Sequence, residues 1–539
     1  MNVYDMVHVS RAPASPFVAR FSDAPSLNSS RAVMTWSKLP FRAETASCLV
    51  LHRVSESDTL LTVNLSVLFL HHQSCVIFWA ATAASLTDEI AQHFCVLLIT
   101  CQAASRMSRL HLHFFPRNYV ACEAHWSGKQ PAFRRQPSSP LTSWRPGGPG
   151  EDCVFEKKVD FPKISPLIIN SALKFVLPTK ENDSELIRLP IGTDLTLACP
   201  GNTIKGQEKE TVAAKCTGGN VLSVDGKDMK LSDLGCKRKP KSAILSHLDY
   251  CGAGDVGVLA SIGFQIREDE FYEVISVCYD ENKETTLYSK HTIHGANIAA
   301  KDIDPKRPSF KTSKGFFNIS MKTCYEKKTQ LKLMQDLLQD NSMAETYIFP
   351  KKQYYFAKGH LAPDADFVTE AEQDATYYYI NAVPQWQAFN NGNWKYLEVA
   401  TRTLAEYLGT DLEIYTGAWG VLELDDVNAN PVEVFLGLTV NERVVPAPAV
   451  SWKVIYDKKN SRAVGVVGVN NPHITSPPTP LCSDLCSSLP WIEFDVSDLG
   501  HGYTYCCTVQ DLRESIPHVP DFGDVSLLDV SLGSSGGGC

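Results

Sequence analysis

The pattern of hydrophobic and polar positions changes twice along the chain. Residues 1–150 show no sustained period of either two or 3.6 residues. After residue 150, short apolar runs separated by Gly, Asn and Asp predict strands at 167–169, 195–198 and 221–224. From about residue 246 the two periods mix, which predicts strands at 271–278 and 452–456 and a helix from Ala388 to Tyr407.

These patterns predict an α+β fold with a central antiparallel sheet, preceded by a small β-rich module that contains cysteines. We place the module at 151–245, the α+β domain at 246–525 and a flexible tail at 526–539. Residues 136–150, rich in Pro, Gly and Ser, are the expected linker. Residues 1–150 remain unassigned, and we expect them to be disordered or an artefact of the gene model.

The cysteine count indicates an oxidising compartment. The chain has 17 cysteines, twelve of them after residue 150. Those at 153, 199, 216 and 236 can form two bridges in the module, with the pairing left open, and Cys324 and Cys539 are candidates for unpaired thiols. Sequons at Asn182 and Asn318 are compatible with secretion. We therefore expect a secreted protein, although no signal peptide follows Met1.

Charge and hydropathy exclude two broad classes. Residues 1–150 contain 13 basic and 8 acidic residues, which leaves 38 basic and 52 acidic residues for 151–539, so the two parts carry +5 and -14. The larger part is not a general basic coat for nucleic acid, and phosphate contacts there must be local. The most apolar stretch, 60–84, contains Asn64 and is broken by His71 and His72, so no membrane association is expected.

Candidate chemistry gathers in one window. It runs from Lys358-Gly359-His360 through Asn381 and Gln385 to Asn390, Lys395 and Glu398. A neutral imidazole can take a proton from water, and an amide oxygen can hold a hard cation such as magnesium. At about 100° per residue, Asn390 and Glu398 lie within roughly 80° of each other on one helix, so both can face one metal. Arg402 continues that side and can pair with Glu398 or reach a phosphate.

Several motifs in order resemble the DNA/RNA non-specific endonucleases, a family of ββα-metal nucleases. They are Lys-Gly-His-Leu-Ala-Pro from Lys358, Asn-Ala-Val-Pro-Gln from Asn381, and Phe-Asn-Asn-Gly-Asn-Trp-Lys-Tyr-Leu-Glu up to Glu398. Segments from Ile293, Arg307 and Cys482 further resemble crustacean duplex-specific nucleases. The resemblance covers about 151–525. The commoner family motif has Arg where this chain has Lys358, which keeps the charge but loses the bidentate guanidinium.

The resemblance implies a role for each motif residue. His360 is then the general base, Asn390 the direct metal ligand and Asn381 a supporting residue, while Glu398 holds water of the metal. Lys358 joins the catalytic set, and Lys395, Arg402 and Gln385 are assigned to substrate binding.

The resemblance also implies a Mg²⁺ cofactor, with Mn²⁺ as an alternative. The expected substrate is nucleic acid, mainly duplex DNA, cut to leave 5′-phosphate ends. The alternatives are a secreted digestive nuclease acting on double-stranded RNA or on all nucleic acids, and an inactive nucleic-acid-binding protein. An intracellular nuclease would need fewer disulfides. The sequence carries no signal for the oligomeric state.

Three other patterns have simpler interpretations. Cys482, Cys486, His501, Cys506 and Cys507 fit zinc templates poorly, so we expect disulfides there. Asp364 and Asp366 are interpreted as loop residues that cap or orient. Residues 425–430 lack the glycine and distal glutamate of a calcium loop and are expected to form a turn.

Overall fold

The computed structural model divides the chain into two compact units, Met1–Pro140 and Leu141–Cys539. It describes residues 151–303 and 306–532, together with the backbone of short strands in the first unit. The prediction for residues 1–150, the stretch at 60–84 and Cys539 therefore lie wholly or largely outside the described residues. The strands of the first unit are β1 Val7–Ser10, β2 Phe17–Ala19, β3 Val33–Met34, β4 Ala46–Arg53, β5 Leu60–Val67, β6 Val76–Phe78, β7 Leu98–Thr100 and β8 Leu110–His111.

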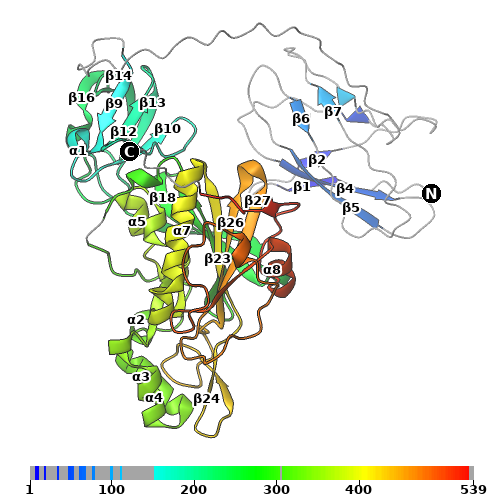
Figure 1. Cartoon of the computed structure of the whole chain (residues 1–539). Coiled ribbons are helices and arrows are strands. Elements are labelled where there is room, and N and C mark those ends of the chain that lie inside the picture. The colour runs from blue at the N-terminus through cyan, green and yellow to red at the C-terminus, as the bar shows by residue number, and fades with distance from the viewer. Residues whose placement is uncertain are drawn as a thin grey trace. The chain divides into compact units, whose positions relative to one another are not determined.

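The predicted β-rich module opens the second unit (Figure 1). Its two sheets have the strand orders β10-β13-β14-β15-β16 and β11-β12-β9, and the three predicted strands are confirmed as β10, β13 and β15. The elements are β9 Cys153–Glu156, α1 Lys157–Asp160, β10 Leu167–Asn170, β11 Thr179–Glu181, β12 Ser184–Leu189, β13 Asp194–Ala198, β14 Thr211–Gly218, β15 Val221–Val224, β16 Lys227–Lys230 and the 3-10 turn η1 Leu231–Asp233.

Two disulfides, Cys153–Cys216 and Cys199–Cys236, cross the small core of this module. Such bridges stabilise a module whose core is too small to do so alone. The module also shares a core with the next domain, because Leu167 and Ile169 of β10 pack with Ile262 and Phe264.

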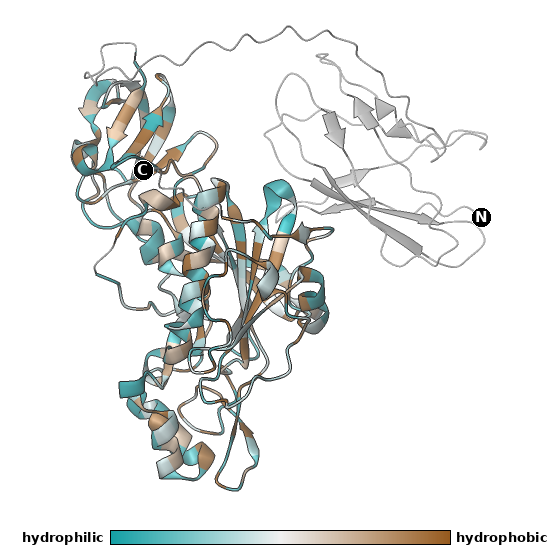
Figure 2. Cartoon of the chain, in the orientation of Figure 1, coloured by the Kyte–Doolittle hydropathy of each residue, from teal (hydrophilic) through white to brown (hydrophobic). Residues whose placement is uncertain are grey.

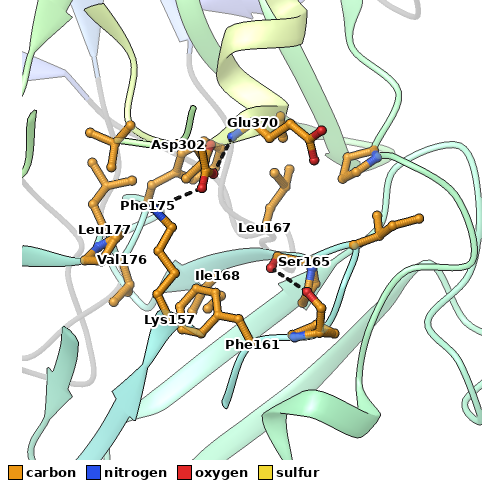
Figure 3. Close-up of a pocket in the computed structure, with 18 of the residues that line it drawn as sticks. Lys157, Phe161, Ser165, Leu167, Ile168, Phe175, Val176, Leu177, Asp302 and Glu370 are labelled. Carbon is orange, nitrogen blue, oxygen red and sulfur yellow. Dashed lines mark hydrogen bonds and ion pairs between the residues drawn. The ribbon is translucent and has the colours of Figure 1, made fainter. Parts of the chain in front are cut away.

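A cavity of about 420 Å³ lies at this junction. Figure 3 shows Lys157 reaching across it to Asp302, at 2.9 Å, above an apolar floor that includes Phe161 and Leu167. Lys157 also pairs with Glu185 at 2.9 Å. No predicted site residue lines the cavity. The Lys157–Asp302 ion pair beside it joins the module to the second domain.

A nine-stranded sheet forms the centre of the second domain. Its order is β17-β18-β19-β20-β23-β26-β27-β28 with antiparallel neighbours, and β29 adds a parallel pairing to β27. The predicted central antiparallel sheet is thus confirmed. The strands are β17 Ala243–Cys251, β18 Gly257–Arg267, β19 Glu270–Asp280, β20 Thr285–Ile293, β23 Leu412–Trp419, β26 Val450–Asp457, β27 Arg462–Val469, β28 Thr504–Cys507 and β29 Ser526–Leu527.

Helices cover both faces of this sheet. Leu397 and Leu404 of α7 pack with Ile414 and Ile455 on one face, whereas α8 packs by Leu512 on the other. The strands are mostly apolar and the outer helix surfaces polar (Figure 2). The helices are α2 Met321–Cys324, α3 Lys327–Leu338, α4 Asn341–Tyr347, α5 Glu370–Ala375, α6 Gln387–Asn390, α7 Asn393–Leu408 and α8 Val509–Ser515.

Short elements complete the domain. They are the 3-10 turns η2 Ala253–Asp255, η3 Ile298–Ala300, η4 Pro350–Lys352, η5 Asp364–Asp366, η6 Tyr379–Asn381, η7 Lys458–Asn460 and η8 Cys486–Ser488, and the strands β21 Phe356–His360, β22 Ala382–Trp386, β24 Glu423–Asp425 and β25 Pro431–Glu433. None of the helices in 151–303 and 306–532 combines the length and apolar content of a transmembrane segment.

Two predicted boundaries shift. The domain begins at Ala243, because β17 from that residue onward is the edge strand of the central sheet. The tail begins later than residue 526, because β29 pairs with β27, Leu528 is fully buried and Trp491 Nε1 donates to the Leu528 carbonyl at 2.9 Å. Residues 533–539 lie outside the described residues.

All ten cysteines expected to pair do so, and Cys324 is buried and free as predicted. Cys251–Cys278 ties β17 to β19, and Cys482–Cys507 and Cys486–Cys506 fasten the loop before β28. Asp484 lies close to Cys486 and Cys506, but a disulfide already joins these two sulfurs. The expected disulfides are confirmed and the zinc interpretation is excluded.

The expected turn at 425–430 is confirmed. Asp426 Oδ1 accepts from the backbone N–H groups of Asn428 and Asn430, both at 2.8 Å. These bonds close the turn from within.

Candidate active site

The site is built on a two-stranded ribbon in which β21 pairs antiparallel with β22. Side chains alternate along β21, so Lys358 and His360 share one face and Gly359 lies on the other. A Cβ at Gly359 would lie 2.0 Å from Gln385 Oε1. Only glycine therefore allows β21 to approach the side chain behind it.

His360 is held between two aromatic rings. The ring centroids of Phe310 and Tyr377 each lie 4.8 Å from the imidazole. Burial lowers the pKa of His360 to about 4, an effect that Asp364 opposes and Arg307 and Lys358 reinforce. Its buried Nε2 has no hydrogen-bond partner within the described part of the chain. The imidazole is therefore neutral near pH 7, with one nitrogen free for a proton.

Lys358 lies beside the same aromatic group. Its Nζ is 5.6 Å from the Phe310 ring centroid and 5.1 Å from that of Tyr325. Burial lowers the pKa of Lys358, and it forms no ion pair with a carboxylate of the described residues. Phe310, which the sequence reasoning did not single out, thus contacts both predicted catalytic side chains.

Asn381 fastens the turn that follows His360. Its Oδ1 accepts from the Ala362 N–H at 3.0 Å and from Ser289 Oγ at 3.2 Å, and its Nδ2 donates to the carbonyls of Ala362 at 2.8 Å and Thr376 at 3.0 Å. The side chain is fully buried. These bonds fix the backbone that follows His360.

The predicted continuous helix from Ala388 to Tyr407 is wrong, because it breaks after Asn390. α6 ends at Asn390 and α7 begins at Asn393. A Cβ at Gly392 would lie 2.4 Å from the His501 carbonyl oxygen, and Asn393 Nδ2 donates to the carbonyls of Asp495 and Gly502. The angle of roughly 80° inferred for Asn390 and Glu398 on one helix therefore does not apply.

Asn390 and Glu398 nevertheless have uncommitted oxygens. Both are half-buried, and neither side chain forms a hydrogen bond to another described residue. α6 packs against β21, the strand that carries His360. The pKa of Glu398 is raised to about 7, because burial outweighs the nearby charges of Lys453 and Arg402. Asp364 influences both Glu398 and His360, which places these two groups in one electrostatic neighbourhood.

Arg402 is committed to a buried ion pair. Its Nη1 donates to Asp366 Oδ1 at 2.6 Å, and His291 Nε2 lies 2.9 Å from Asp366 Oδ2. Burial alone would raise the pKa of Asp366, but His291 and Arg402 hold it at about 2. Of the two possibilities considered for Arg402, a pair with Glu398 or a contact with phosphate, the first does not form, and the guanidinium pairs instead with Asp366, which is 2% exposed and whose charge requires a partner.

The two aspartates orient their neighbours, as expected of loop residues in η5. Asp364 accepts from the Tyr377 hydroxyl at 2.7 Å, and its Oδ2 lies 3.3 Å from Arg307 Nε. Tyr377 in turn contacts the His360 ring. Asp364 therefore helps to hold the Tyr377 ring against His360.

The sheet supports the site through buried polar side chains on its α7-facing side. Ser289 bonds to Asn381, His291 to Asp366, and Ser451 Oγ accepts from Gln385 Nε2 at 2.7 Å. The sequence reasoning missed these residues. The available signal was pairs of polar side chains two residues apart, on one face of a strand, at 289 and 291 and at 451 and 453.

Lys453 extends this polar row. It is 1% exposed, and its Nζ donates to Thr416 Oγ1 at 2.6 Å. The register aligns Ser289 with Thr416 and Thr416 with Lys453 across three strands. A buried ammonium thus lies beneath α7, where its charge acts on Asp366 and Glu398.

The remaining predicted substrate residues lie in different surroundings. Gln385 is fully buried behind β21, so its side chain does not reach the surface. The expected direct contact of Gln385 with substrate is therefore wrong, and the side chain supports the ribbon instead. Lys395 is exposed, with its Nζ 3.5 Å from Asn391 Oδ1.

Comparison with known proteins relates part of this chain to one family of nucleases. The DNA/RNA non-specific endonuclease model matches residues 255–512. A salivary endonuclease of Lutzomyia longipalpis is 28% identical over 329 residues, which are 60% of this chain and 73% of the relative. Salivary protein Tsal1 of Glossina morsitans morsitans is 27% identical over 385 residues, 70% of this chain and 94% of the relative.

A solved structure also aligns with part of the chain. A chain of the EndoG/EndoGI complex covers 39% of this chain and 76% of its own length, at 19% identity and a TM-score of 0.27. The family match spans β18 to α8 and contains both the ribbon and α7. Residues 255–512 thus resemble the DNA/RNA non-specific endonucleases, and this match, with relatives that are named endonucleases, supports a hydrolase that acts on nucleic acid.

Proposed function

We propose that the protein is a secreted, magnesium-dependent endonuclease in which His360 is the general base and Asn390 the metal ligand. The observation that carries the proposal is the buried, unpartnered Nε2 of a neutral His360 on the strand against which α6 packs. An inactive binding protein would have no use for such a group. The proposed reaction is hydrolysis of phosphodiester bonds, with products that carry 5′-phosphate ends.

His360 would accept the proton of the attacking water. Its low pKa keeps the imidazole unprotonated, and the rings of Phe310 and Tyr377 fix its plane. Asn381 holds the backbone that follows it. The base is thus oriented before substrate arrives, which general-base catalysis requires.

The free oxygen donors fit a hard divalent cation. Asn390 offers an amide oxygen and Glu398 a carboxylate, and neither is committed to another described residue. Mg²⁺ prefers a few such oxygens and keeps several waters, and Mn²⁺ accepts the same set. When bound, the cation would neutralise charge on the scissile phosphate and on the leaving oxygen. A nearby cation would also favour the ionised form of Glu398.

Lys358 would contact the substrate phosphate. Its ammonium is half-buried beside Phe310 and Tyr325, without a carboxylate to neutralise it among the described residues. A lysine acts here as a point charge, whereas an arginine would bind two phosphate oxygens together. Arg402 would act indirectly, through its ion pair with Asp366.

We expect double-stranded DNA, and the DNA strand of DNA–RNA hybrids, to be cut faster than single strands or duplex RNA. Phosphate contacts position a duplex without reading bases, and A-form RNA presents a different groove and a 2′-hydroxyl. The measurement is the initial rate on length-matched duplex DNA, single-stranded DNA, duplex RNA and hybrid, with Mg²⁺ and with chelator.

Each other pattern of rates has its own meaning. Equal rates on all four substrates would contradict the duplex preference and leave a general nuclease. Fastest cutting of duplex RNA would favour an RNA-directed digestive enzyme. Binding without cleavage in Mg²⁺ would favour the inactive protein.

We also expect residues 1–150 to be dispensable. A chain that begins at Glu151 and is exported to an oxidising compartment should fold, form its five disulfides and keep full activity, because Cys153 to Leu532 contain all described site residues. The measurements are free-thiol titration, thermal unfolding and specific activity beside the full chain. Loss of activity in the shortened chain alone would show that the first unit takes part.

A further inference from the structure

Two nearby segments of the chain, one of which contains the proposed metal ligand Asn390, carry positive charge without any acidic residue. Residues 346–363 and 375–397 contain Lys351, Lys352, Lys358 and Lys395 but no Asp or Glu. The rest of the chain after residue 150 is strongly acidic, so these segments are a local exception. Such a contrast marks a place where a polyanion can approach.

Side-chain and backbone bonds bring the two segments together at Asn391. Its Nδ2 donates to Gln353 Oε1 at 3.1 Å, and its Oδ1 lies 3.5 Å from Lys395 Nζ. The Ala388 N–H donates to the Gln353 carbonyl at 3.1 Å, which docks the η4 turn onto α6. Lys351 and Lys352 end η4, immediately before Gln353. Lys395 thus contacts the residue next to Asn390, and Lys351 and Lys352 lie in the turn that docks beside it.

These lysines are available to a ligand. Lys351, Lys352 and Lys395 are exposed, and none forms an ion pair with a described residue. Elsewhere in the described chain many exposed lysines are paired, such as Lys209 with Asp225 and Lys237 with Glu208. Lys358 lies on β21 in the same acid-free segment, so the charge continues toward His360.

We propose that Lys351, Lys352 and Lys395 form a lysine rim that binds backbone phosphates of a duplex beyond the scissile bond. The inference rests on the proposed nuclease function and adds to it the surface that receives the substrate. The rim contributes binding common to ground state and transition state, because its exposed ammonium groups have no contact with His360 among the described residues. Its loss therefore raises KM and leaves kcat in place.

The test is the full chain with Lys351→Ala and Lys352→Ala together, and separately with Lys395→Ala. Lys227→Ala with Lys230→Ala, on β16 of the module, removes the same charge from exposed lysines away from the ribbon and is the matched control. KM and kcat for duplex DNA are measured across a salt series. Each phosphate contact contributes about one to the slope of log affinity against log salt.

We expect the double variant to raise KM several-fold and to keep kcat within about twofold. Its slope of log affinity against log salt should be flatter than that of the control pair by about two. The slope of Lys395→Ala should be flatter by about one. A KM and slope equal to those of the control pair would overturn the rim. A fall in kcat with an unchanged KM would also overturn it. Failure of the proposed catalytic role would be seen separately, as full activity of the His360→Ala variant. In that case the salt dependence of KM could still be compared between the lysine variants and the control pair.

Discussion

Replacing His360 by alanine is expected to lower kcat by about two to four orders of magnitude, the range that general-base catalysis supplies. The unfolding midpoint should stay close to that of the unmodified protein, because the buried Nε2 forms no hydrogen bond to a described residue that folding would lose. The measurements are single-turnover cleavage of duplex DNA in Mg²⁺ and thermal unfolding by circular dichroism.

Two further variants separate catalysis from packing. Because His360 contacts Phe310 and Tyr377, His360→Gln keeps most of its volume and should lose activity to a similar degree. His501→Ala is the matched control, since that imidazole is exposed and bonds to Asp498. If His360→Ala retained activity within a few fold at an unchanged midpoint, His360 would not be the base.

Replacing Asn390 by alanine should weaken the apparent affinity for Mg²⁺ and the rate together. The side chain is the proposed protein ligand of the cation, so its loss should exceed the roughly 10- to 100-fold effects typical of residues that only support ligands. Removal of the cation by chelator should abolish cleavage in the unmodified protein. The measurement is the cleavage rate across a Mg²⁺ titration.

The choice of substitutions distinguishes ligation from folding. Asn390→Asp keeps an oxygen donor and should recover part of the Mg²⁺ affinity that alanine loses. Asn220→Ala, on an exposed turn of the module where Asn220 bonds to Asp160, serves as the control. Unaltered Mg²⁺ dependence and turnover in Asn390→Ala would place the ligand elsewhere.

The buried charges beneath α7 give the site its rigidity. Asp366 joins His291 of the sheet to Arg402 of the helix, and Lys453 adds a second positive charge from below. Removing one member of a buried pair leaves an uncompensated charge, which is strongly destabilising. These residues thus fix where α7 lies over the sheet, and with it the direction of Glu398.

The local pattern of residues was sufficient to predict several strands and to show the motifs in their order. Short apolar runs bounded by Gly, Asn and Asp predicted β10, β13 and β15, and the strand predicted at 452–456 lies within β26, because strand preference depends on neighbours along the chain. The motifs that contain His360, Asn381 and Asn390, in that order, were sufficient to suggest the resemblance to a nuclease family that the match over residues 255–512 agrees with. The cysteine count was sufficient to predict an oxidised protein, although not to pair the cysteines.

Only the tertiary structure decided which partners these residues meet. At the helix break after Asn390, the Asn393 N–H donates at 3.0 Å to the His501 carbonyl, more than a hundred residues away, and this oxygen leaves no room for a Cβ at Gly392. Asp366, 36 residues from Arg402, pairs with the guanidinium for which sequence spacing left Glu398 or a phosphate open, because a buried carboxylate needs a charged partner. Gln385 turns inward for the same kind of reason, since Ser451 on a distant strand offers its buried amide a hydrogen bond. Periodicity records which face of an element is apolar, whereas hydrogen bonds between distant segments depend on how those faces meet in three dimensions.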